Sequence, residues 1–345
     1  MATMATTRWA GSSGESLRLT GSREGALEAP PVYVNGAFVP AARAGISVFD
    51  HGLLYGDGVF EGIRFFEGRI FELEAHVERF FRSAEAIGLE VPLPPAGVRD
   101  AILETAARSG LREGYLRPLL TRGSGDLGLD PRKARHPNFL ILCAPLDAFG
   151  EAAERGVRLV VSRWRRTPRA SLDPNIKSLN YLNNILAKVE ASGRGADDAL
   201  LLDLAGNVAE ASGENVFAVR GREVRTPPTD VCLRGITRDR VLRYLSGRYR
   251  TLEAELPWPE ILDSDEIFLT GTGAGILPVV EIEGHRIGSG RPGPLTREVQ
   301  AWYRELTHRS GTPIPYRIPS GGPEGSGGGG PNGEIRRKRN HRIRS

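Results

Sequence analysis

A lysine at the entrance to a predicted helix is the candidate nucleophile of this sequence. Lys177 follows the irregular segment 171–176, and the apolar residues after it recur at helical spacing. These apolar residues are Leu179, Leu182, Ile185, Leu186 and Val189. A lysine held against apolar neighbours loses its proton more easily than a solvated lysine, and its neutral amine can then attack a carbonyl carbon. The lysine taken alone leaves open the alternative of an ordinary solvated side chain.

A fixed pattern of acidic, amide and glycine positions follows this lysine. The pattern is E-x-[small]-x-x-N-[apolar]-[FY], then an apolar residue and Thr, and then [apolar]-x-G-[apolar]-x-[KR]. Its positions are filled by Glu210, Ser212, Asn215, Val216, Phe217, Val224, Thr226, Leu233, Gly235, Ile236 and Arg238. In these residues the chain resembles the class IV pyridoxal-phosphate aminotransferases, and among them most closely the branched-chain amino-acid aminotransferases. The resemblance covers approximately residues 32–307.

The resemblance implies a fold and a reaction. The expected fold is α+β and of fold type IV, with a small α/β domain and a larger, mixed, β-barrel-like domain with helices. The expected cofactor is pyridoxal 5'-phosphate, and the expected reaction is amino transfer from L-leucine, L-isoleucine or L-valine to 2-oxoglutarate. A D-amino-acid aminotransferase and an aminodeoxychorismate lyase share this fold and are the alternatives. The segment from Tyr55 to Arg64, Arg117 and the GDLGLDP loop favour the branched-chain type. No metal site is expected.

The resemblance also assigns the cofactor-binding residues. It implies that Lys177 is catalytic and holds the cofactor, that Tyr181 contacts the ring hydroxyl, and that Glu210 contacts the ring nitrogen. The phosphate group would be held by Arg79, Ile236, Thr237 and Thr272. An arginine suits this role because its planar fork can hold a phosphate by two parallel bonds. The start of a predicted helix at residues 236–237 offers free N–H groups to an anion. The alternatives are a surface arginine and an ordinary helix cap.

The substrate-binding residues implied by the resemblance are Tyr55, Phe60, Arg64, Tyr115, Arg117, Thr272 and Gly273. A purely apolar pocket for a branched side chain would reject glutamate, because burying an unpaired carboxylate is costly. Arg117 lies between leucines in the predicted strand 114–123 and would pair with that carboxylate. The alternative for Arg117 is a structural ion pair with Asp126 or Asp130.

The chain divides into five predicted parts. These are a disordered leader at 1–31, a small domain at 32–146, a linker at 147–156, a larger cofactor-binding domain at 157–310, and a disordered Gly-rich basic tail at 311–345. By the resemblance, the loop 123–137 covers the active site of a neighbouring subunit in a dimer or a dimer-based hexamer. Two positions depart from the family: Gly275 stands where many relatives have an acidic residue, and Phe149 is the aromatic residue nearest to where many have a tyrosine.

Charge and cysteine content narrow the function classes. The predicted tail holds seven Lys or Arg and two Glu, a net of +5, whereas the whole chain is +4, so the remaining residues are near −1. The predicted folded part therefore lacks the net positive charge that would attract nucleic acid, so the high pI does not indicate a nucleic-acid-binding protein. Cys143 and Cys232 lie in apolar segments, which indicates reduced thiols and a cytoplasmic protein. No run of 18 apolar residues occurs, so no membrane span is predicted.

Overall fold

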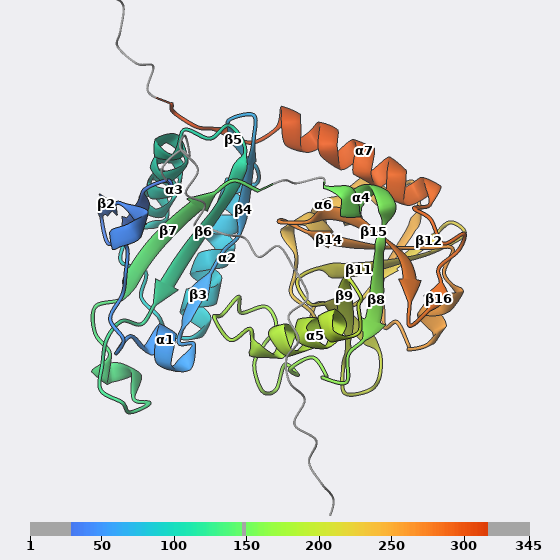
Figure 1. The fold of residues 1–345 in the computed structure, drawn as a ribbon, viewed down its shortest axis with the longest axis horizontal. Coiled ribbons are helices and arrows are strands. Elements are labelled where there is room, and N and C mark those ends of the chain that lie inside the picture. Colours follow the sequence, from blue (N-terminus) through green and yellow to red (C-terminus); the bar gives the residue numbers. More distant parts are fainter. Residues whose placement is uncertain (1–28, 147–149, 317–345) are drawn as a thin grey trace, which may run out of the picture.

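The computed structural model describes residues 29–146 and 150–316. Two separate sheets, one mostly N-terminal and the other C-terminal, lie side by side and carry helices (Figure 1). The predicted α+β, two-domain fold is confirmed. The leader up to residue 28, Phe149, and the tail from residue 317 onward fall outside the described residues. None of the helices in the described ranges is long and apolar enough to cross a membrane.

The first sheet has eight strands in the order β17-β5-β4-β6-β7-β1-β2, with β3 also paired to β6, and its strand pairs are antiparallel. The strands are β1 (Val32–Val34), β2 (Ala37–Val39), β3 (Gly58–Phe60), β4 (Ile63–Phe66), β5 (Arg69–Ile70), β6 (Gly114–Thr121), β7 (Asn138–Ala144) and β17 (Thr312–Pro313). The helical segments of this part are a 3₁₀ turn (Ala41–Arg43), α1 (His51–Tyr55), α2 (Leu73–Ala86), α3 (Pro95–Ser109) and a second 3₁₀ turn (Pro131–Lys133).

The second sheet has nine strands in the order β10-β9-β8-β15-β14-β11-β12-β13, with β16 also paired to β15. It is mixed, because β8 runs parallel to β9 and β15, and β12 runs parallel to β13. The strands are β8 (Val157–Val161), β9 (Asp198–Leu202), β10 (Val208–Ala211), β11 (Asn215–Arg220), β12 (Glu223–Thr226), β13 (Arg250–Glu253), β14 (Glu266–Gly271), β15 (Gly275–Ile282) and β16 (His285–Arg286). The helical segments are α4 (Glu151–Arg155), α5 (Leu182–Gly193), α6 (Ile236–Leu245), a 3₁₀ turn (Glu260–Asp263) and α7 (Pro294–Arg309).

Helix α2 packs an apolar stripe against the first sheet. Val77, Phe80 and Ala84 are buried in the core of that sheet, while Phe81 and Ile87 are partly buried against it. Residues at these spacings share one face of a helix, so one side of α2 is apolar and faces the core. This packing fixes the polar residues on the neighbouring part of α2 relative to the first sheet.

The helix after Lys177 differs from its prediction in two ways. It begins at Leu182, so Lys177 lies five residues before it, in a segment that pairs with β3. Apolar residues at helical spacing usually face a core, yet the side chains of Leu182, Ile185 and Val189 are 65%, 54% and 59% exposed. The buried face of α5 instead carries small residues, Ala187 and Ala191 among them, which allow α5 to approach β8 and β9 closely. The segment 182–193 is helical, as its spacing predicts, and the face of α5 that packs in the core is the one with the small residues.

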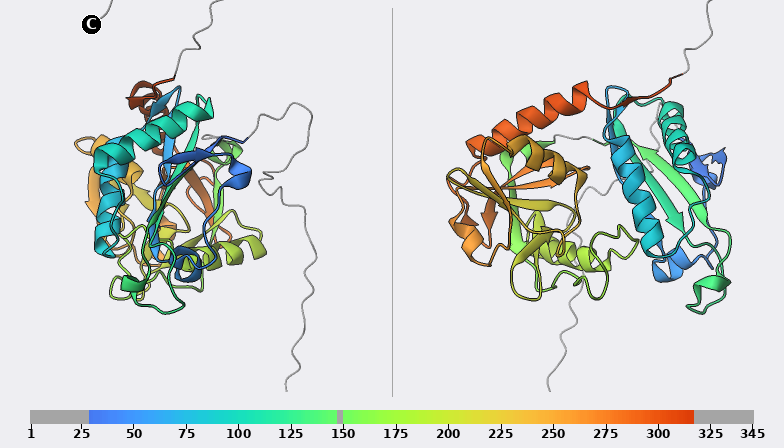
Figure 2. Two further views of the ribbon diagram at one scale, coloured as in Figure 1. Left: turned by 90° about the vertical axis from the view of Figure 1, so that its left-hand side faces the viewer. Right: turned by 180° about the vertical axis from the view of Figure 1, so that it is seen from behind.

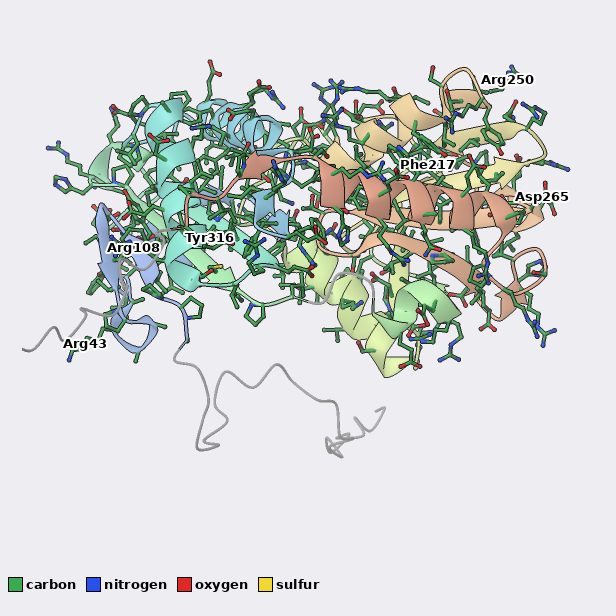
Figure 3. The ribbon with its side chains drawn as sticks, turned by 90° about the horizontal axis from the view of Figure 1, so that it is seen from above. Arg43, Arg108, Phe217, Arg250, Asp265 and Tyr316 are labelled. Carbon is green, nitrogen blue, oxygen red and sulfur yellow. The ribbon has the colours of Figure 1, made fainter. Side chains whose placement is uncertain are left out.

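The predicted tail begins too early. Strand β17 pairs Thr312 with Ile70 of β5, so the chain returns from α7 to the first sheet (Figure 2). Ile314 lies in the core of that sheet and is only 6% exposed. The Tyr316 hydroxyl donates to the Leu111 carbonyl at 2.5 Å. Figure 3 shows Tyr316 lying with the first sheet, well away from Phe217 of the second. Residues 312–316 contain apolar side chains that bury, which separates them from the Gly-rich sequence that follows.

Ending the chain after Gly311 should therefore lower the stability of the protein relative to ending it after Tyr316. The shorter chain loses β17 and the buried Ile314, and burial of one such side chain contributes about 2 kcal/mol. The midpoints of thermal unfolding of the two truncated proteins should differ by roughly 4–8 °C. Identical midpoints would mean that residues 312–316 contribute nothing to folding.

Candidate active site between the two sheets

The Lys177 side chain lies between aromatic rings where the two sheets meet. Its Nζ is 3.0 Å from the Tyr181 hydroxyl and 4.5 Å from the centre of the Phe60 ring. Its backbone is fixed at both polar groups, because its N–H donates to Ser83 Oγ at 3.1 Å and its carbonyl accepts from the Phe60 N–H at 3.0 Å. The structure thus brings Lys177 and Tyr181 together, and both side chains are partly buried.

Glu210 is a buried carboxylate with two fixed hydrogen bonds. It lies on β10 with 6% exposure, and its Oε1 accepts from Arg166 Nε at 2.5 Å. Its Oε2 accepts from the Leu233 N–H at 3.0 Å. Arg166 is not distinguished in the sequence, because it is one arginine among several in the segment 163–169. The guanidinium of Arg166 supplies the counter-charge that a buried carboxylate needs.

A pocket at the junction of the two sheets gathers most of the predicted residues. It is lined by Gly62, Arg79, Tyr115, Lys177, Gly213, Asn215, Leu233, Gly235, Ile236, Thr237, Thr270, Gly271, Thr272 and Gly273. Phe60 and Tyr181 both contact Lys177, which lines this pocket. Arg64 donates to the carbonyl of Gly273, another lining residue, at 3.3 Å. Tyr55 is not among the residues that line this pocket; it is 37% exposed, and its hydroxyl donates to the Leu127 carbonyl at 2.6 Å.

The start of α6 offers unshared N–H groups to this pocket. Gly235 precedes the helix in an extended conformation, and no side chain caps the helix. The N–H groups of the first turn have no partner within the helix, since the N–H of Asp239 is the first to bond back, to the Gly235 carbonyl at 2.9 Å. Thr237 is buried, with its hydroxyl 3.4 Å from the Tyr303 hydroxyl. This end of α6 is suited to an anion.

Arg79 is buried and already holds a carboxylate. Its Nε and Nη2 donate to the two carboxylate oxygens of Glu61 at 2.6 and 2.8 Å, and its Nη1 donates to the Arg234 carbonyl at 3.1 Å. One side of its planar fork is thus used, and only the remaining N–H groups of Nη1 and Nη2 are left for another anion. The alternative of a surface arginine is wrong, because Arg79 is 5% exposed. Glu61 carries no local pattern in the sequence that would have singled it out.

Two glycines around the pocket stand where no side chain fits. A Cβ added at Gly62 would lie 1.8 Å from the Tyr115 hydroxyl oxygen, and one added at Gly235 would lie 2.1 Å from Asn215 Oδ1. Gly275, which departs from the family, has a φ of 68°, a conformation that favours glycine. These positions allow the backbone of both sheets to approach polar side chains closely.

The hydroxyl of Thr270 has no hydrogen-bond partner among the described residues, although Thr270 is 1% exposed. Because an unsatisfied buried hydroxyl is costly, a group that enters the pocket would supply its missing hydrogen bond. Thr270 lines the same pocket as Lys177 and Thr272. The motifs single out Thr272 and miss Thr270; a Thr-x-Thr pair at the end of a predicted strand is the available signal.

Arg117 has no ion pair with either acid that the sequence offered. Asp126 pairs with Lys133 at 2.7 Å, and Asp130 pairs with Arg132 at 2.7 Å. Arg117 Nη2 donates instead to the Tyr115 hydroxyl at 2.9 Å, and its guanidinium lies 4.7 Å from the centre of the Phe60 ring. Its Nε is buried without a hydrogen-bond partner in the described part of the chain. The structural ion pair considered for Arg117 is thus not formed.

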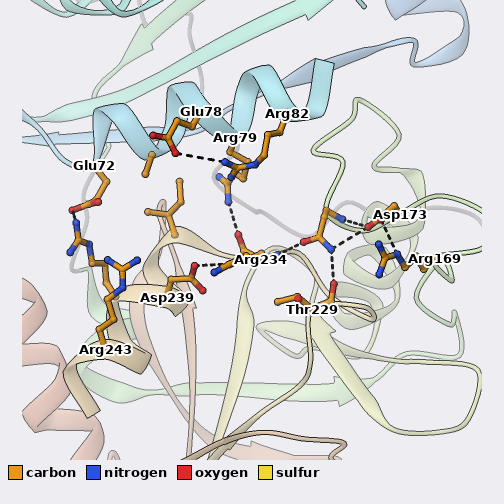
Figure 4. Close-up of a pocket in the computed structure, with 14 residues that line it drawn as sticks. Glu72, Glu78, Arg79, Arg82, Arg169, Asp173, Thr229, Arg234, Asp239 and Arg243 are labelled. Carbon is orange, nitrogen blue, oxygen red and sulfur yellow. Dashed lines mark hydrogen bonds and ion pairs between the residues drawn. The ribbon is translucent and has the colours of Figure 1, made fainter. Parts of the chain in front are cut away.

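A second groove lies on the other side of Arg79, between α2 and α6 (Figure 4). Ion pairs line this groove: Arg240 pairs with Glu72 at 2.5 Å, and Arg234 pairs with Asp239 at 2.9 Å. The Glu72–Arg240 pair joins parts of the chain that belong to different sheets. No cluster of three or more metal-ligating side chains occurs within residues 29–146 and 150–316.

Comparison with known proteins points to one family. A family model described as Amino-transferase class IV matches residues 58–282. A protein of Methanocaldococcus jannaschii, provisionally named a branched-chain-amino-acid aminotransferase, is 41% identical over 285 residues, which is 82% of this chain and 98% of that protein. A branched-chain amino acid aminotransferase from T.th., solved with pyridoxamine 5'-phosphate, has a TM-score of 0.79 and 39% identity over 82% of this chain and 95% of its own. Its complex with N-(5'-phosphopyridoxyl)-L-glutamate has a TM-score of 0.78 and 38% identity, with the same coverage.

Replacement of Gly62 by alanine should destabilise the protein and displace Tyr115. The added Cβ would overlap the Tyr115 hydroxyl, and overpacking of this kind costs about 1–3 kcal/mol. Gly45→Ala is the matched control, because nothing lies within 4 Å of a Cβ at that position. Denaturant unfolding should show a lower free energy of unfolding for Gly62→Ala and little change for Gly45→Ala. Equal values for the two variants would contradict the close contact.

Proposed function

Because the chain belongs to the class IV aminotransferase family, we propose that it transfers the amino group of L-leucine, L-isoleucine or L-valine to 2-oxoglutarate with pyridoxal 5'-phosphate as cofactor. The observation that carries the proposal is the Lys177 amine, 3.0 Å from the Tyr181 hydroxyl in a pocket that also receives the start of α6. The names of the relatives favour this reaction over that of a D-amino-acid aminotransferase or an aminodeoxychorismate lyase.

The residues present fit this cofactor. The pocket combines an amine for the aldehyde, a phenol beside that amine, and uncapped helical N–H groups with an arginine for the phosphate. The unsatisfied hydroxyl of Thr270 is a further sign that a polar group belongs in this pocket. When bound, the cofactor supplies an electron sink for the bond that breaks at the substrate Cα. The residues that would hold it are Arg79, Lys177, Tyr181, Glu210, Ile236, Thr237 and Thr272.

Lys177 has two tasks in this proposal. Its Nζ would hold the cofactor covalently at rest, and as a free amine it would move the proton that leaves the substrate Cα. Tyr181 supports both tasks, because its hydroxyl lies within hydrogen-bond distance of Nζ. The backbone bonds to Ser83 and from Phe60 keep the start of the lysine side chain in one place while its end moves.

Glu210 would face the ring nitrogen of the cofactor as a carboxylate. Arg166 Nε at 2.5 Å and the Leu233 N–H at 3.0 Å both donate to this carboxylate and hold it in place. A carboxylate in that position would accept a hydrogen bond from a protonated ring nitrogen and keep the proton there. We infer that Arg166 serves the reaction only through Glu210, as a positioning residue.

Arg117 is the residue we assign to the side-chain carboxylate of glutamate and 2-oxoglutarate. It has no acidic partner among the described residues, and it is held by the Tyr115 hydroxyl and the Phe60 ring. Aromatic rings beside a guanidinium can also accept an aliphatic side chain. Phe60 and Tyr115 would therefore serve leucine, and the guanidinium would serve glutamate.

The remaining substrate-binding residues have supporting roles in this proposal. Arg64 and Gly273 would shape the same pocket, since Arg64 donates to the Gly273 carbonyl. Thr272 and Gly273 would offer backbone N–H groups to the α-carboxylate of the substrate. Tyr55 lies outside this group, because its hydroxyl is bonded to Leu127 on the loop 123–137, and we give it no role in this pocket.

We also propose a homodimer. Apolar side chains are exposed on the loop 123–137, where Leu127 and Leu129 are 69% and 78% exposed, and on α5, where Leu182 and Ile185 are 65% and 54% exposed. Large apolar side chains that are exposed in this way are typical of subunit interfaces. A cytoplasmic location is consistent with two buried cysteines that form no disulfide.

Reduction of the holoenzyme with borohydride should attach the phosphopyridoxyl group to Lys177, because no other lysine lines the pocket within the described residues. Peptide mapping by mass spectrometry identifies the labelled residue. Lys177→Ala should abolish the label, and Lys188→Ala, which changes a half-exposed lysine on α5, should keep it. A label on any other lysine would contradict the proposed active site.

Replacement of Arg117 by leucine should impair the half-reactions of glutamate and 2-oxoglutarate far more than that of leucine. The missing charge-assisted pair corresponds to about 2–5 kcal/mol for the substrate that carries a second carboxylate. Single-turnover rates with each substrate separately measure the difference, and the leucine rate of the same variant controls for folding. Comparable losses with both substrates would rule out the assignment of Arg117.

A further inference from the structure

Arg79 of the proposed phosphate site forms a buried ion pair with Glu61. Glu61 lies between β3 and β4 with 1% exposure, and both of its carboxylate oxygens accept from Arg79, at 2.6 and 2.8 Å. The same carboxylate is 2.8 Å from His76 Nδ1. All three side chains are buried, so water contributes little to the stability of their charges. Glu61 is the only acid that pairs with Arg79 in the part of the chain described.

The charges of this cluster balance without any ligand. Burial alone would raise the pKa of Glu61, but the neighbouring charge and hydrogen bonds of Arg79 outweigh it and hold that pKa well below its usual range. Burial lowers the pKa of His76 by more than Glu61 raises it, which favours the neutral ring. The cluster thus consists of one anion, one cation and one neutral ring.

An incoming phosphate would meet an arginine that already has an anion. Arg79 lines the pocket beside Ile236 and Thr237, at the start of α6. Its Nε and Nη2 point at Glu61, and its Nη1 donates to the Arg234 carbonyl on the side of the second groove (Figure 4). A phosphate in the pocket and the Glu61 carboxylate therefore share a single guanidinium, and two anions so placed repel each other.

We propose that Glu61 is the resident counter-ion of Arg79, which neutralises and positions this arginine in the apoenzyme and competes with the cofactor phosphate for it in the holoenzyme. The inference rests on the proposed function, because it takes the pocket at the start of α6 as the phosphate site. Glu61 then has two opposite effects. Its carboxylate stabilises the fold of the cofactor-free protein, and it weakens the binding of phosphate at the site. Glu61 is accordingly a positioning residue and not a catalytic one.

Glu61→Gln separates these two effects. Glutamine keeps the shape of the side chain and one oxygen that accepts from Arg79; it removes the charge and replaces the second accepting oxygen with an NH2 group. Without cofactor, the Glu61→Gln protein then carries a buried Arg79 cation with no counter-ion, so the midpoint of its thermal unfolding should fall. A phosphate that binds beside Arg79 replaces the missing charge, so the affinity of the variant for phosphate ligands should rise, by about tenfold or more.

Glu72→Gln is the matched control. Glu72 also pairs with one arginine, Arg240 at 2.5 Å, although this pair joins the two halves of the molecule. Arg240 is 35% exposed at its side chain, so water can solvate it after the substitution. This variant should lose some stability, and its gain on binding a phosphate ligand should equal that of the unaltered protein.

The experiment measures the thermal midpoint of the three apoproteins against increasing pyridoxamine 5'-phosphate, which has no aldehyde to react with Lys177. Ligand-induced stabilisation gives the apparent affinity in each case. Inorganic phosphate is titrated in parallel to isolate the contribution of the phosphate group. The inference predicts the lowest midpoint without ligand and the largest gain with either ligand for Glu61→Gln.

Equal gains for Glu61→Gln and the unaltered protein would overturn the inference and leave Glu61 a structural residue. An unaltered protein that gains nothing from pyridoxamine 5'-phosphate would overturn the proposed function itself. If Glu61→Gln does not fold, the double variant Glu61→Gln/Arg79→Gln removes both charges. It should fold and show a weaker phosphate response than the unaltered protein, and a double variant as unstable as the single one would overturn the counter-ion role.

Discussion

The short backbone pairing between residues 177–179 and β3 is the contact on which the site depends. The Phe60 N–H donates to the Lys177 carbonyl at 3.0 Å, and the Leu179 N–H donates to the Gly58 carbonyl at 2.9 Å. A Cβ at Gly58 would lie 2.4 Å from the Leu120 carbonyl oxygen, so this approach of β3, β6 and the lysine segment requires glycine. Because the lysine segment leads into α5 of the second half, the pairing fixes the nucleophile and the relative position of the two sheets together.

Ionic interactions around the site follow from the burial of its charged groups. Two buried carboxylates each face an arginine, Glu210 with Arg166 and Glu61 with Arg79, so neither charge is left without a counter-charge. Arg117 and the Thr270 hydroxyl are the contrasting cases. Both keep a buried polar atom without a partner among the described residues, and both lie at or beside the pocket that contains Lys177. At these two positions a group bound in the pocket would supply the missing hydrogen bond.

The residues of the pocket can be predicted from the sequence more reliably than the elements that carry them. Lys177, Arg79, Thr237 and Thr272 are identified by motifs, and all line one pocket. Their partners Glu61 and Arg166 are missed, because an ion pair between residues far apart in sequence leaves no local pattern. The start of α5 is predicted too early, because apolar residues before Leu182 continue the helical period while the segment itself pairs as a strand. The tail is predicted to begin at residue 311, because composition averages over Ile314 and Tyr316, whose burial is decided by contacts with the first half of the chain.

The reversed face of α5 shows why periodicity alone cannot identify a core. A helix can be apolar on two sides, and the side with smaller residues can approach a sheet more closely. Ala187 and Ala191 pack in the core against the sheet, which leaves Leu182 and Ile185 exposed at the end of the molecule that also carries α1 (Figure 1).

That end of the molecule is held together within one chain. Asn180 Nδ2 donates to the Gly56 carbonyl at 2.9 Å, and the Tyr55 hydroxyl donates to the Leu127 carbonyl. The lysine segment, α1 and the loop 123–137 are thus linked by hydrogen bonds before any second subunit arrives. A partner that covers these exposed leucines would meet a preformed surface, and its binding would need little ordering of the residues around Lys177.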